Sequence, residues 1–292
     1  MAPLITLLTD FGASDSYVAS MKGVILGIDP DARIVDMSHD IPPQDVLACA
    51  FVLSTAYRHF PKGAIHVLVV DPGVGTRRRG IVLQTSDATF VAPDNGLLSY
   101  VLEDLAPSGV APSMTPFTLR RKPVPAGVRA FALRDPRYRL SAVSATFHGR
   151  DVFAPAAAHL SRGVPAERLG PRVASLWSYR LPRPQRRRDG SLVGHVLHID
   201  RFGNAITNVT SKDLPRGAVR VQVKGRVIRG LSRAYAASPS HGKGTKEGKV
   251  LALVGSSDYL EIAVRNGNAA ACLDLKRGDE VLITLGTSTP DT

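Results

Sequence analysis

Four polar loops carry the residue types that could do chemistry, and each of them follows an apolar segment. They are "TDFGASD" at 9–15, "DPGVGTRRR" at 71–79, "FHGRD" at 147–151 and "DRFGNAITN" at 200–208. The first two loops place Asp10 and Asp71 where a predicted strand ends. Ligands of open α/β sheets bind beyond the carboxyl ends of the strands, so both carboxylates are candidates for a site. Aspartates at strand ends also stabilise turns, and position alone leaves both roles open.

The loop at 71–79 combines a glycine-rich turn with three consecutive arginines. It lacks the GxxxxGK[ST] spacing of a phosphate-binding loop, and no helix clearly follows it. The turn can instead bring Asp71 and Arg78 to one pocket, where a carboxylate and a guanidinium form a fixed, charged hydrogen-bond fork. The alternative is an exposed ion pair, which is worth at most about 1 kcal/mol. His148 is the third candidate, although a lone histidine in a loop is commonly structural.

A metal ion could in principle bind to Asp10, Asp71, His148 and Asp151. However, the chain has no HxH or HExxH motif and no clustered Cys/His spacing. It also lacks the GxSxG motif that surrounds one class of serine nucleophile. We therefore expect neither a bound metal nor a serine nucleophile.

Two domains are expected from the hydrophobic pattern. Residues 1–178 alternate buried strands with helices, which predicts an α/β N-terminal domain with a mostly parallel central sheet. Residues 179–191 are rich in proline and arginine and are interpreted as a linker. Residues 192–292 contain short strands with alternating polarity, which predict a smaller all-β, barrel-like C-terminal domain. The predicted strands are 4–9, 32–38, 64–71, 80–86, 88–96, 191–200, 218–225, 226–231, 249–257, 259–264 and 279–285. The predicted helices are 16–28, 42–60, 97–105 and one that follows a loop within 146–163 and ends at Gly163.

The net charge of the 292-residue chain is +12, which can indicate a polyanionic partner. The charge lies in short arginine runs, and no zinc-finger, RNP-type or helix-turn-helix pattern accompanies it. We therefore expect no specific nucleic-acid partner. No apolar run approaches the roughly 20 residues of a membrane helix, and no signal peptide is visible, so we expect a cytoplasmic protein without a membrane partner. Cys49 and Cys272 lie in apolar surroundings and are expected to be buried free thiols.

Six segments, taken in order, resemble the S-adenosyl-L-methionine hydroxide adenosyltransferase family, which is related to the fluorinases and chlorinases. The resemblance runs from about residue 4 to residue 285. Six motifs in the same order make it much more specific than any one of them. The segments are "LLTDFGASDSYVASMKGVI", "VVDPGVGTRRRGIVLQT", "FVAPDNGLLSYVL", "TFHGRDVFAPAAAHL", "IDRFGNAITN" and "GSSDYLEIAVRNGNAA".

The resemblance implies a specific reaction. Members of this family split S-adenosyl-L-methionine with water at the ribose 5′ carbon and release adenosine and L-methionine. An Asp–Arg–His set orients and activates the water, and its counterparts here are Asp71, Arg78 and His148, with Arg77 and Arg79 as bystanders. Either Asp71 or His148 could accept the proton. The substrate carries its own leaving group, a sulfonium, so no cofactor is expected.

The resemblance also assigns residues that bind the substrate. Asp10 would bind the ribose hydroxyls, Asp200 the methionine ammonium and Asn204 the edge of the adenine. Tyr235 would stack on the adenine, and Ser257 would bind the methionine carboxylate. Phe202, Asn95 and Ala269 complete the predicted set. The final motif departs from the family pattern at Asp258 and Arg265, so the adenine contacts within 256–269 stay open.

Two alternatives accompany this interpretation. A halogenase of the same family would use a halide as nucleophile, but such enzymes carry tyrosine in place of Asp71, and the fluorinase carries serine in place of Gly149. Hydrolysis is favoured because Asp71 and His148 can both handle a proton of water. The second alternative is a non-catalytic protein that binds an adenosyl ligand or a nucleic acid. The family resemblance further implies a homotrimer with sites between subunits.

Overall fold

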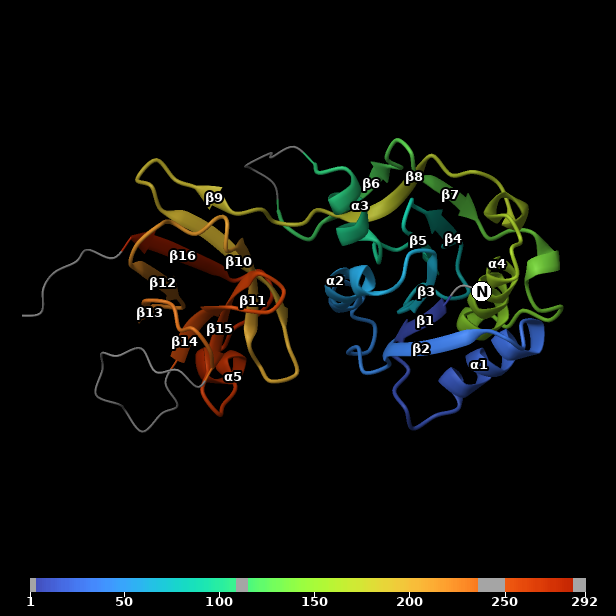
Figure 1. Ribbon diagram of the computed structural model, residues 1–292, viewed down its shortest axis with the longest axis horizontal. Helices are drawn as coiled ribbons and strands as arrows, with labels where there is room; N and C mark the ends of the chain where they lie inside the picture. The colour runs from blue at the N-terminus through green and yellow to red at the C-terminus, as the bar shows by residue number, and fades with distance from the viewer. Residues whose placement is uncertain (1–3, 109–114, 236–249, 286–292) are drawn as a thin grey trace, which may run out of the picture. The chain divides into compact units, whose positions relative to one another are not determined.

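The computed structural model describes residues 4–108, 115–235 and 250–285, and its internal contacts divide the chain into two compact units (Figure 1). Unit 1 is Met1–Arg180 and unit 2 is Leu181–Thr292. In the described ranges, no helix has the length and apolar character that crossing a membrane would require.

Unit 1 is built on a six-stranded sheet with the order β2-β1-β3-β5-β4-β7. Three neighbouring pairs are parallel (β1 with β2, β1 with β3 and β3 with β5), whereas β4 pairs antiparallel with β5 and with β7. The expected α/β domain is therefore confirmed, and its sheet is mixed at the β4–β7 edge. The strands are β1 (Leu4–Thr9), β2 (Arg33–Ser38), β3 (Ala64–Val69), β4 (Gly80–Gln84), β5 (Ala88–Pro93) and β7 (Arg129–Ala132).

Helices supply the apolar side chains of two core clusters, one on each side of this sheet. Helix α1 (Tyr17–Ile28) packs with α4 (Ala154–Ser161), and their side chains share one cluster with Ile5 and Val67 of the sheet. Helices α2 (Val46–Ala56) and α3 (Ser99–Leu105) join the other cluster, which contains Leu8 and Leu68. Because both faces are covered, every residue of β3 is buried.

Helix α2 begins later than the sequence pattern predicted. The prediction of a helix over 42–60 included both prolines, but the first helical residue is Val46. Asp45 caps it, since the Asp45 carboxylate accepts a hydrogen bond of 2.9 Å from the backbone of Ala48. Gln44 has φ of +65°, a left-handed conformation that a helix cannot contain. The residues before Val46 therefore form a loop rather than a first helical turn.

Two further strands pair outside the main sheet. Strand β6 (Leu119–Pro123) and strand β8 (Ser175–Tyr179) form an antiparallel ribbon, although no strand was predicted at either place. Asp94, which follows β5 and whose side chain is 2% exposed, accepts hydrogen bonds from Arg79 and Arg121 and one of 2.7 Å from the backbone of Trp177. This carboxylate fastens the ribbon to the ends of β4 and β5.

Unit 2 is an antiparallel, nearly closed barrel-like sheet, as expected from the sequence. Its strand order is β13-β12-β16-β10-β11-β15-β14, and the short β9 also pairs with β10. Strand β11 and the short helix α5 (Ala269–Leu273) were not predicted, because both lie inside polar motifs. The strands are β9 (Gln185–Arg186), β10 (Leu192–Ile199), β11 (Ala205–Thr210), β12 (Val219–Val223), β13 (Arg226–Arg229), β14 (Val250–Val254), β15 (Tyr259–Val264) and β16 (Glu280–Leu285).

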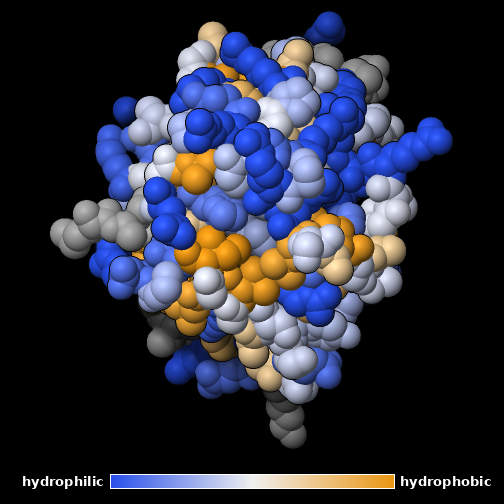
Figure 2. Space-filling model, turned by 90° about the vertical axis from the view of Figure 1, so that its right-hand side faces the viewer, coloured by the Kyte–Doolittle hydropathy of each residue, from blue (hydrophilic) through white to orange (hydrophobic). Residues whose placement is uncertain are grey.

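The face that lies on the right in Figure 1 is largely hydrophilic, with one group of hydrophobic residues near its middle (Figure 2).

Both cysteines are free, as predicted, but only Cys49 is buried, and the prediction that Cys272 is buried was wrong. In the short helix α5, Ala269 and Leu273 face the interior, whereas Cys272 lies on the exposed side.

We predict that Asp94→Ala destabilises unit 1 by about 3 kcal/mol, the lower end of the range for breaking a buried ion pair, because Arg79 is itself partly exposed. Urea unfolding followed by circular dichroism measures the change. Asp87→Ala is the matched control, since Asp87 forms its ion pair with Lys62 at the surface and should leave the unfolding midpoint unchanged. Equal unfolding midpoints for the two variants would contradict the structural role of Asp94.

Candidate active site

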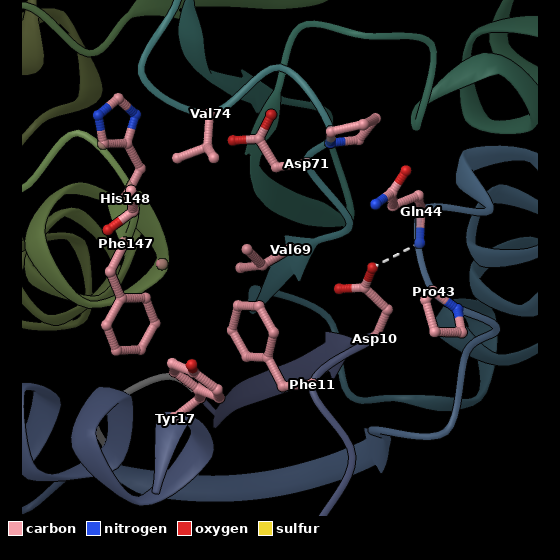
Figure 3. A pocket seen from close by; sticks show the side chains of 13 residues that line it. Asp10, Phe11, Tyr17, Pro43, Gln44, Val69, Asp71, Val74, Phe147 and His148 are labelled. Carbon is pink, nitrogen blue, oxygen red and sulfur yellow. Dashed lines mark hydrogen bonds between the residues drawn. The ribbon is translucent and has the colours of Figure 1, made fainter. Parts of the chain in front are cut away.

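A cavity of about 380 Å³ opens in unit 1 at the carboxyl ends of β1 and β3 (Figure 3). These strands are parallel neighbours with Thr9 opposite Val69, so the residues that follow them emerge at the same edge of the sheet. Asp10 and Asp71 both line the cavity for this reason. The lining residues are Asp10, Phe11, Tyr17, Pro43, Gln44, Val69, Asp71, Pro72, Val74, Thr146, Phe147, His148 and Gly149.

The predicted Asp71–Arg78 pair is present and nearly buried. Arg78 Nε donates a hydrogen bond of 2.9 Å to Asp71 Oδ1, and Arg78 Nη2 donates to Asp71 Oδ2. The side chains of Arg78 and Asp71 are only 8% and 5% exposed, so this pair is not the surface ion pair that was the alternative. The tight turn between them needs glycine at position 75, where φ is +75° and a Cβ atom would lie 2.3 Å from the carbonyl oxygen of Ala145.

His148 joins this pair through the same guanidinium. Arg78 Nη2 lies 3.1 Å from His148 Nδ1, so the structure brings all three predicted catalytic residues together. His148 stands directly before the π-helical turn η3 (Gly149–Phe153). The fully buried Asp151 holds this turn, because its carboxylate accepts hydrogen bonds from Ser144 N at 2.8 Å and from Arg150 Nε at 2.6 Å.

The contact with Arg78 decides where His148 carries its proton. A guanidinium has five N–H donors and no acceptor, so Nδ1 of His148 must accept in this contact. A ring nitrogen that accepts carries no proton, and the imidazole is then neutral with its proton on Nε2. His148 therefore offers an N–H donor, not a lone pair, to a molecule in the cavity that it lines.

The electrostatics of the three groups are coupled. Burial raises the pKa of Asp71 above its ordinary value, and this effect outweighs the charge and hydrogen bonds of Arg78 and the charge of His148, which lower it. Burial, followed by the positive charge of Arg78, lowers the pKa of His148. The Asp71 carboxylate is thus more basic than usual, and it lies beside an imidazole that binds a proton less readily than usual.

The other two arginines of the run have separate positions. Arg77 is exposed, whereas Arg79 donates to Asp94 on the other side of the turn. Only Arg78 of the three contacts Asp71, as the sequence interpretation expected.

Asp10 also lies in the cavity, and its orientation is fixed from the loop before α2. The backbone N–H of Gln44 donates a hydrogen bond of 2.7 Å to Asp10 Oδ2 (Figure 3). Asn95, by contrast, does not line the cavity. Its side-chain amide donates to the carbonyl of Val70 at 2.9 Å and accepts from the backbone of Leu97, which is a structural use.

Three aromatic side chains form a wall of the cavity that the sequence interpretation did not predict. The rings of Phe11 and Tyr17 pack edge-on against Phe147, with centroids 5.7 Å and 5.1 Å away (Figure 3). Gly149 faces this cluster, because a Cβ atom there would lie 3.3 Å from the rings of Phe11 and Phe147. Phe11 and Phe147 stand beside predicted residues in the sequence, and this adjacency was the available signal.

In unit 2, the structure brings the predicted residues of the 200–208 loop together. Asp200 accepts hydrogen bonds from the backbone N–H of Phe202 at 2.9 Å and from the side-chain amide of Asn204 at 2.9 Å. Phe202 is 76% exposed at the tip of the turn. Gly203 lies against Asn268, the N-cap of α5, so the buried Ala269 lies beside this loop.

Tyr235 has a partner that sequence reasoning missed. Its hydroxyl donates a hydrogen bond of 2.6 Å to Oε2 of Glu261, a residue of β15 that is 6% exposed. Burial raises the pKa of Glu261, and the charge of Asp200 raises it further although Tyr235 lowers it. The Tyr235 ring stays half-exposed, whereas Ser257 is exposed in the turn before β15.

Metal ligands do not gather in the part of the chain that the structure describes, where no group of three or more His, Cys, Asp or Glu side chains could hold an ion. Asp151, which was one of the four possible ligands in the sequence, is used to hold the turn that carries His148.

We predict that Arg78→Met raises the pKa of His148, because a neighbouring positive charge is removed while Asp71 stays. Titration of the histidine ring by NMR measures this change. Arg77→Met is the matched control, since Arg77 is an exposed neighbour in the same run and should leave the His148 titration unchanged. A His148 pKa that is equal or lower in Arg78→Met would rule out the proposed contact.

Comparison with known proteins assigns the family. The chain matches the SAM hydroxide adenosyltransferase N-terminal domain over residues 5–170 and the corresponding C-terminal domain over residues 194–282. It is 40% identical to an (R)-S-adenosyl-L-methionine hydrolase of Thermus thermophilus over 94% of this chain and 96% of that protein. A fluorinase of Nocardia brasiliensis is more distant, at 28% identity over 97% of both chains.

A solved structure shares the fold of this chain. An uncharacterized conserved protein from Thermotoga maritima superimposes with a TM-score of 0.76 at 34% identity, covering 96% of this chain and 99% of that chain. The chain therefore belongs to the SAM hydroxide adenosyltransferase family.

Proposed function

We propose that this protein hydrolyses S-adenosyl-L-methionine to adenosine and L-methionine. The observation that carries the proposal is the junction of Asp71, Arg78 and His148 at one end of a cavity of about 380 Å³. The 40% identical relative from Thermus thermophilus bears the name of this activity, which supports the same reaction here.

The reaction is an in-line displacement at the ribose 5′ carbon. A water oxygen forms a bond to C5′ while the C5′–S bond breaks, and the electron pair of that bond neutralises the sulfonium to give the thioether of methionine. The proton lost by the water goes to a base of the protein. The leaving group is already activated, so we propose that no metal or other cofactor takes part. The task of the protein is to hold and partly desolvate one water behind C5′.

We propose that Asp71 is the base. Asp71 forms an ion pair with Arg78 and its pKa is raised by burial, which makes the carboxylate a better proton acceptor. His148 instead donates from Nε2 to the water oxygen and orients it, because Nδ1 is engaged by Arg78. The guanidinium of Arg78 holds Asp71 with two hydrogen bonds and stabilises negative charge that develops on the water.

The substrate-binding roles follow the family resemblance. In this proposal Asp10 binds the ribose hydroxyls, for which the carboxylate offers Oδ1 while Oδ2 is held by Gln44. Asp200, Phe202, Asn204, Tyr235, Ser257 and Ala269 of unit 2 bind the adenine and methionine parts, with Asn95 as a supporting residue of unit 1. We further propose a cytoplasmic homotrimer in which unit 2 of a neighbouring subunit completes the cavity.

A halogenase is the second candidate, since a fluorinase is among the relatives. Asp71 argues against it. A buried carboxylate at the end of the cavity repels an incoming halide anion, whereas it attracts and deprotonates water.

Incubation of the protein with S-adenosyl-L-methionine in ¹⁸O-labelled water should give adenosine with the label at the 5′ oxygen, together with unlabelled methionine. The rate should not depend on chloride or fluoride, because water is the nucleophile. Liquid chromatography with mass spectrometry identifies both products. A 5′-halogenated adenosine as the main product would establish the halogenase instead, and tight binding without turnover over hours would establish a binding protein.

The assignment of the base predicts unequal variants. Asp71→Asn should lower kcat by about 10²- to 10⁴-fold, the range for loss of a general base. His148→Gln should lower kcat less, since its amide can replace the N–H donor. The rate of the wild type should fall as the pH drops through the raised pKa of Asp71, because protonated Asp71 accepts no proton. His148→Gln should keep this acidic limb; its disappearance in that variant would make His148 the base.

A further inference from the structure

A line of polar side chains runs from the surface of unit 1 to the loop that carries Asp10. Lys22 Nζ donates a hydrogen bond of 2.6 Å to Asp36 Oδ2, and Asp36 Oδ1 lies 3.1 Å from Nε2 of His39. On the other side of the ring, His39 Nδ1 lies 2.9 Å from Thr9 Oγ1. Thr9 Oγ1 also accepts the backbone N–H of Phe11 at 3.2 Å. The line thus ends at Thr9 and Phe11, the two residues that flank Asp10 in the sequence.

The hydrogen positions along this line depend on the tautomer of His39. The Asp36 carboxylate only accepts, so the His39 nitrogen beside it is favoured to carry a proton. The 3.1 Å contact between His39 Nε2 and Asp36 Oδ1 is close but is not well aligned for a hydrogen bond. The other nitrogen, Nδ1, can then accept the hydroxyl proton of Thr9. The lone pairs of Thr9 Oγ1 then accept the hydrogen bond from the backbone N–H of Phe11.

The burial of these groups makes the arrangement specific. Thr9 is fully buried, and the His39 side chain is only 12% exposed, so water cannot readily replace either partner. Asp36 is 40% exposed and anchors the line at the surface. Burial would raise the pKa of Asp36, but the contacts with Lys22 and His39 and their charges lower it overall.

The segment that carries His39 supports the Asp10 loop at two further points. The carbonyl oxygen of His39 accepts the backbone N–H of Gly12 at 2.8 Å. Five residues later, Gln44 N–H donates to Asp10 Oδ2 at 2.7 Å, from a backbone with φ of +65°. Residues 9–12 are therefore held by residues 39–44 through one side-chain contact and two backbone contacts.

We infer that Thr9, His39 and Asp36 are positioning residues that place the Asp10 carboxylate for binding the ribose hydroxyls of the substrate. The inference rests on the proposed function, in which Asp10 has that role. None of the three lines the cavity, so they act through Asp10 and not on the substrate. Loss of the Thr9 hydroxyl frees the Phe11 N–H and the His39 ring together, and the loop can then move the carboxylate away from the ribose.

The test compares two nucleosides that differ only in the ribose hydroxyls. The dissociation constants of adenosine and 2′,3′-dideoxyadenosine are measured by calorimetry with the full-length protein in the presence of L-methionine. Wild type should bind adenosine about 10- to 100-fold more tightly than 2′,3′-dideoxyadenosine, the expected effect of hydrogen bonds to a charged carboxylate. The measured quantity is the ratio of the two dissociation constants. Thr9→Val, which removes the hydroxyl at nearly constant shape, should reduce this ratio to about 3 or less. Thr9→Ser keeps the hydroxyl and should restore most of the ratio.

A second pair of variants lies at the surface and should fold normally. Asp36→Ala should lower the ratio about threefold, whereas Asp40→Ala removes an equal charge from an exposed position of the same segment and should leave it unchanged. In hydrolysis assays, the loss should appear mainly as a higher KM, because Asp71, Arg78 and His148 are not displaced.

The outcomes separate the inference from the proposed function. A wild type that binds the two nucleosides equally would remove the role of Asp10 and, with it, this inference. A wild type that discriminates, together with Thr9→Val and Asp36→Ala variants that discriminate equally well, would overturn the inference alone. If Asp36→Ala and Asp40→Ala lower the ratio equally, the effect comes from the loss of a negative charge and not from the contact with His39. That result would also overturn the inference.

Discussion

The site depends on one buried cation. The Arg78 side chain is 8% exposed, and a charge so nearly buried must be compensated by an anion and by well-formed hydrogen bonds. Asp71 supplies the anion and accepts two hydrogen bonds from Arg78, and Nδ1 of His148 accepts a further one. The same interaction therefore closes the glycine turn, keeps Asp71 facing the cavity and selects one tautomer of His148. Stability and chemistry are linked here, since the groups that satisfy Arg78 are the ones proposed to handle the water.

The sheet supplies the common edge from which these groups emerge. Parallel β1 and β3 end together, which places Asp10 and Asp71 at one end of the unit, and the turn held by Asp151 brings His148 from a distant part of the chain. The loops are then held by further contacts around the cavity. Asp94 fastens the neighbouring ribbon, and residues 39–44 support the Asp10 loop. Preorganisation of this kind lets a few polar groups act without moving at the moment of reaction.

Sequence reasoning predicted the parts of this arrangement that are local or tied to a motif. The alternation of strands and helices gave the two-unit architecture, and the spacing of Asp71 and Arg78 across a tight turn indicated their pairing. The hydrogen bond from Arg78 to His148 spans 70 positions, and only the family resemblance joined His148 to the pair.

Features that depend on the tertiary structure escaped prediction. The contact of Thr9 with His39 spans 30 positions, and Gln44 was placed in a helix because its left-handed backbone leaves no clear mark in the sequence. In the sequence, Glu261 is a single polar residue in an apolar strand. Only the tertiary structure shows that Tyr235 donates a hydrogen bond to it. Strand β11 was hidden because its residues belong to a polar motif that also forms a loop.

The central claim is that Asp71 and His148 converge on one water molecule that Arg78 helps to activate. A crystal structure of the full-length protein with adenosine and L-methionine tests it most directly. The account predicts one ordered solvent oxygen, or the 5′ hydroxyl that replaces it, within about 3.2 Å of both the Asp71 carboxylate and His148 Nε2. Ligands bound elsewhere, or Asp71 and His148 facing separate regions with no shared oxygen, would contradict it.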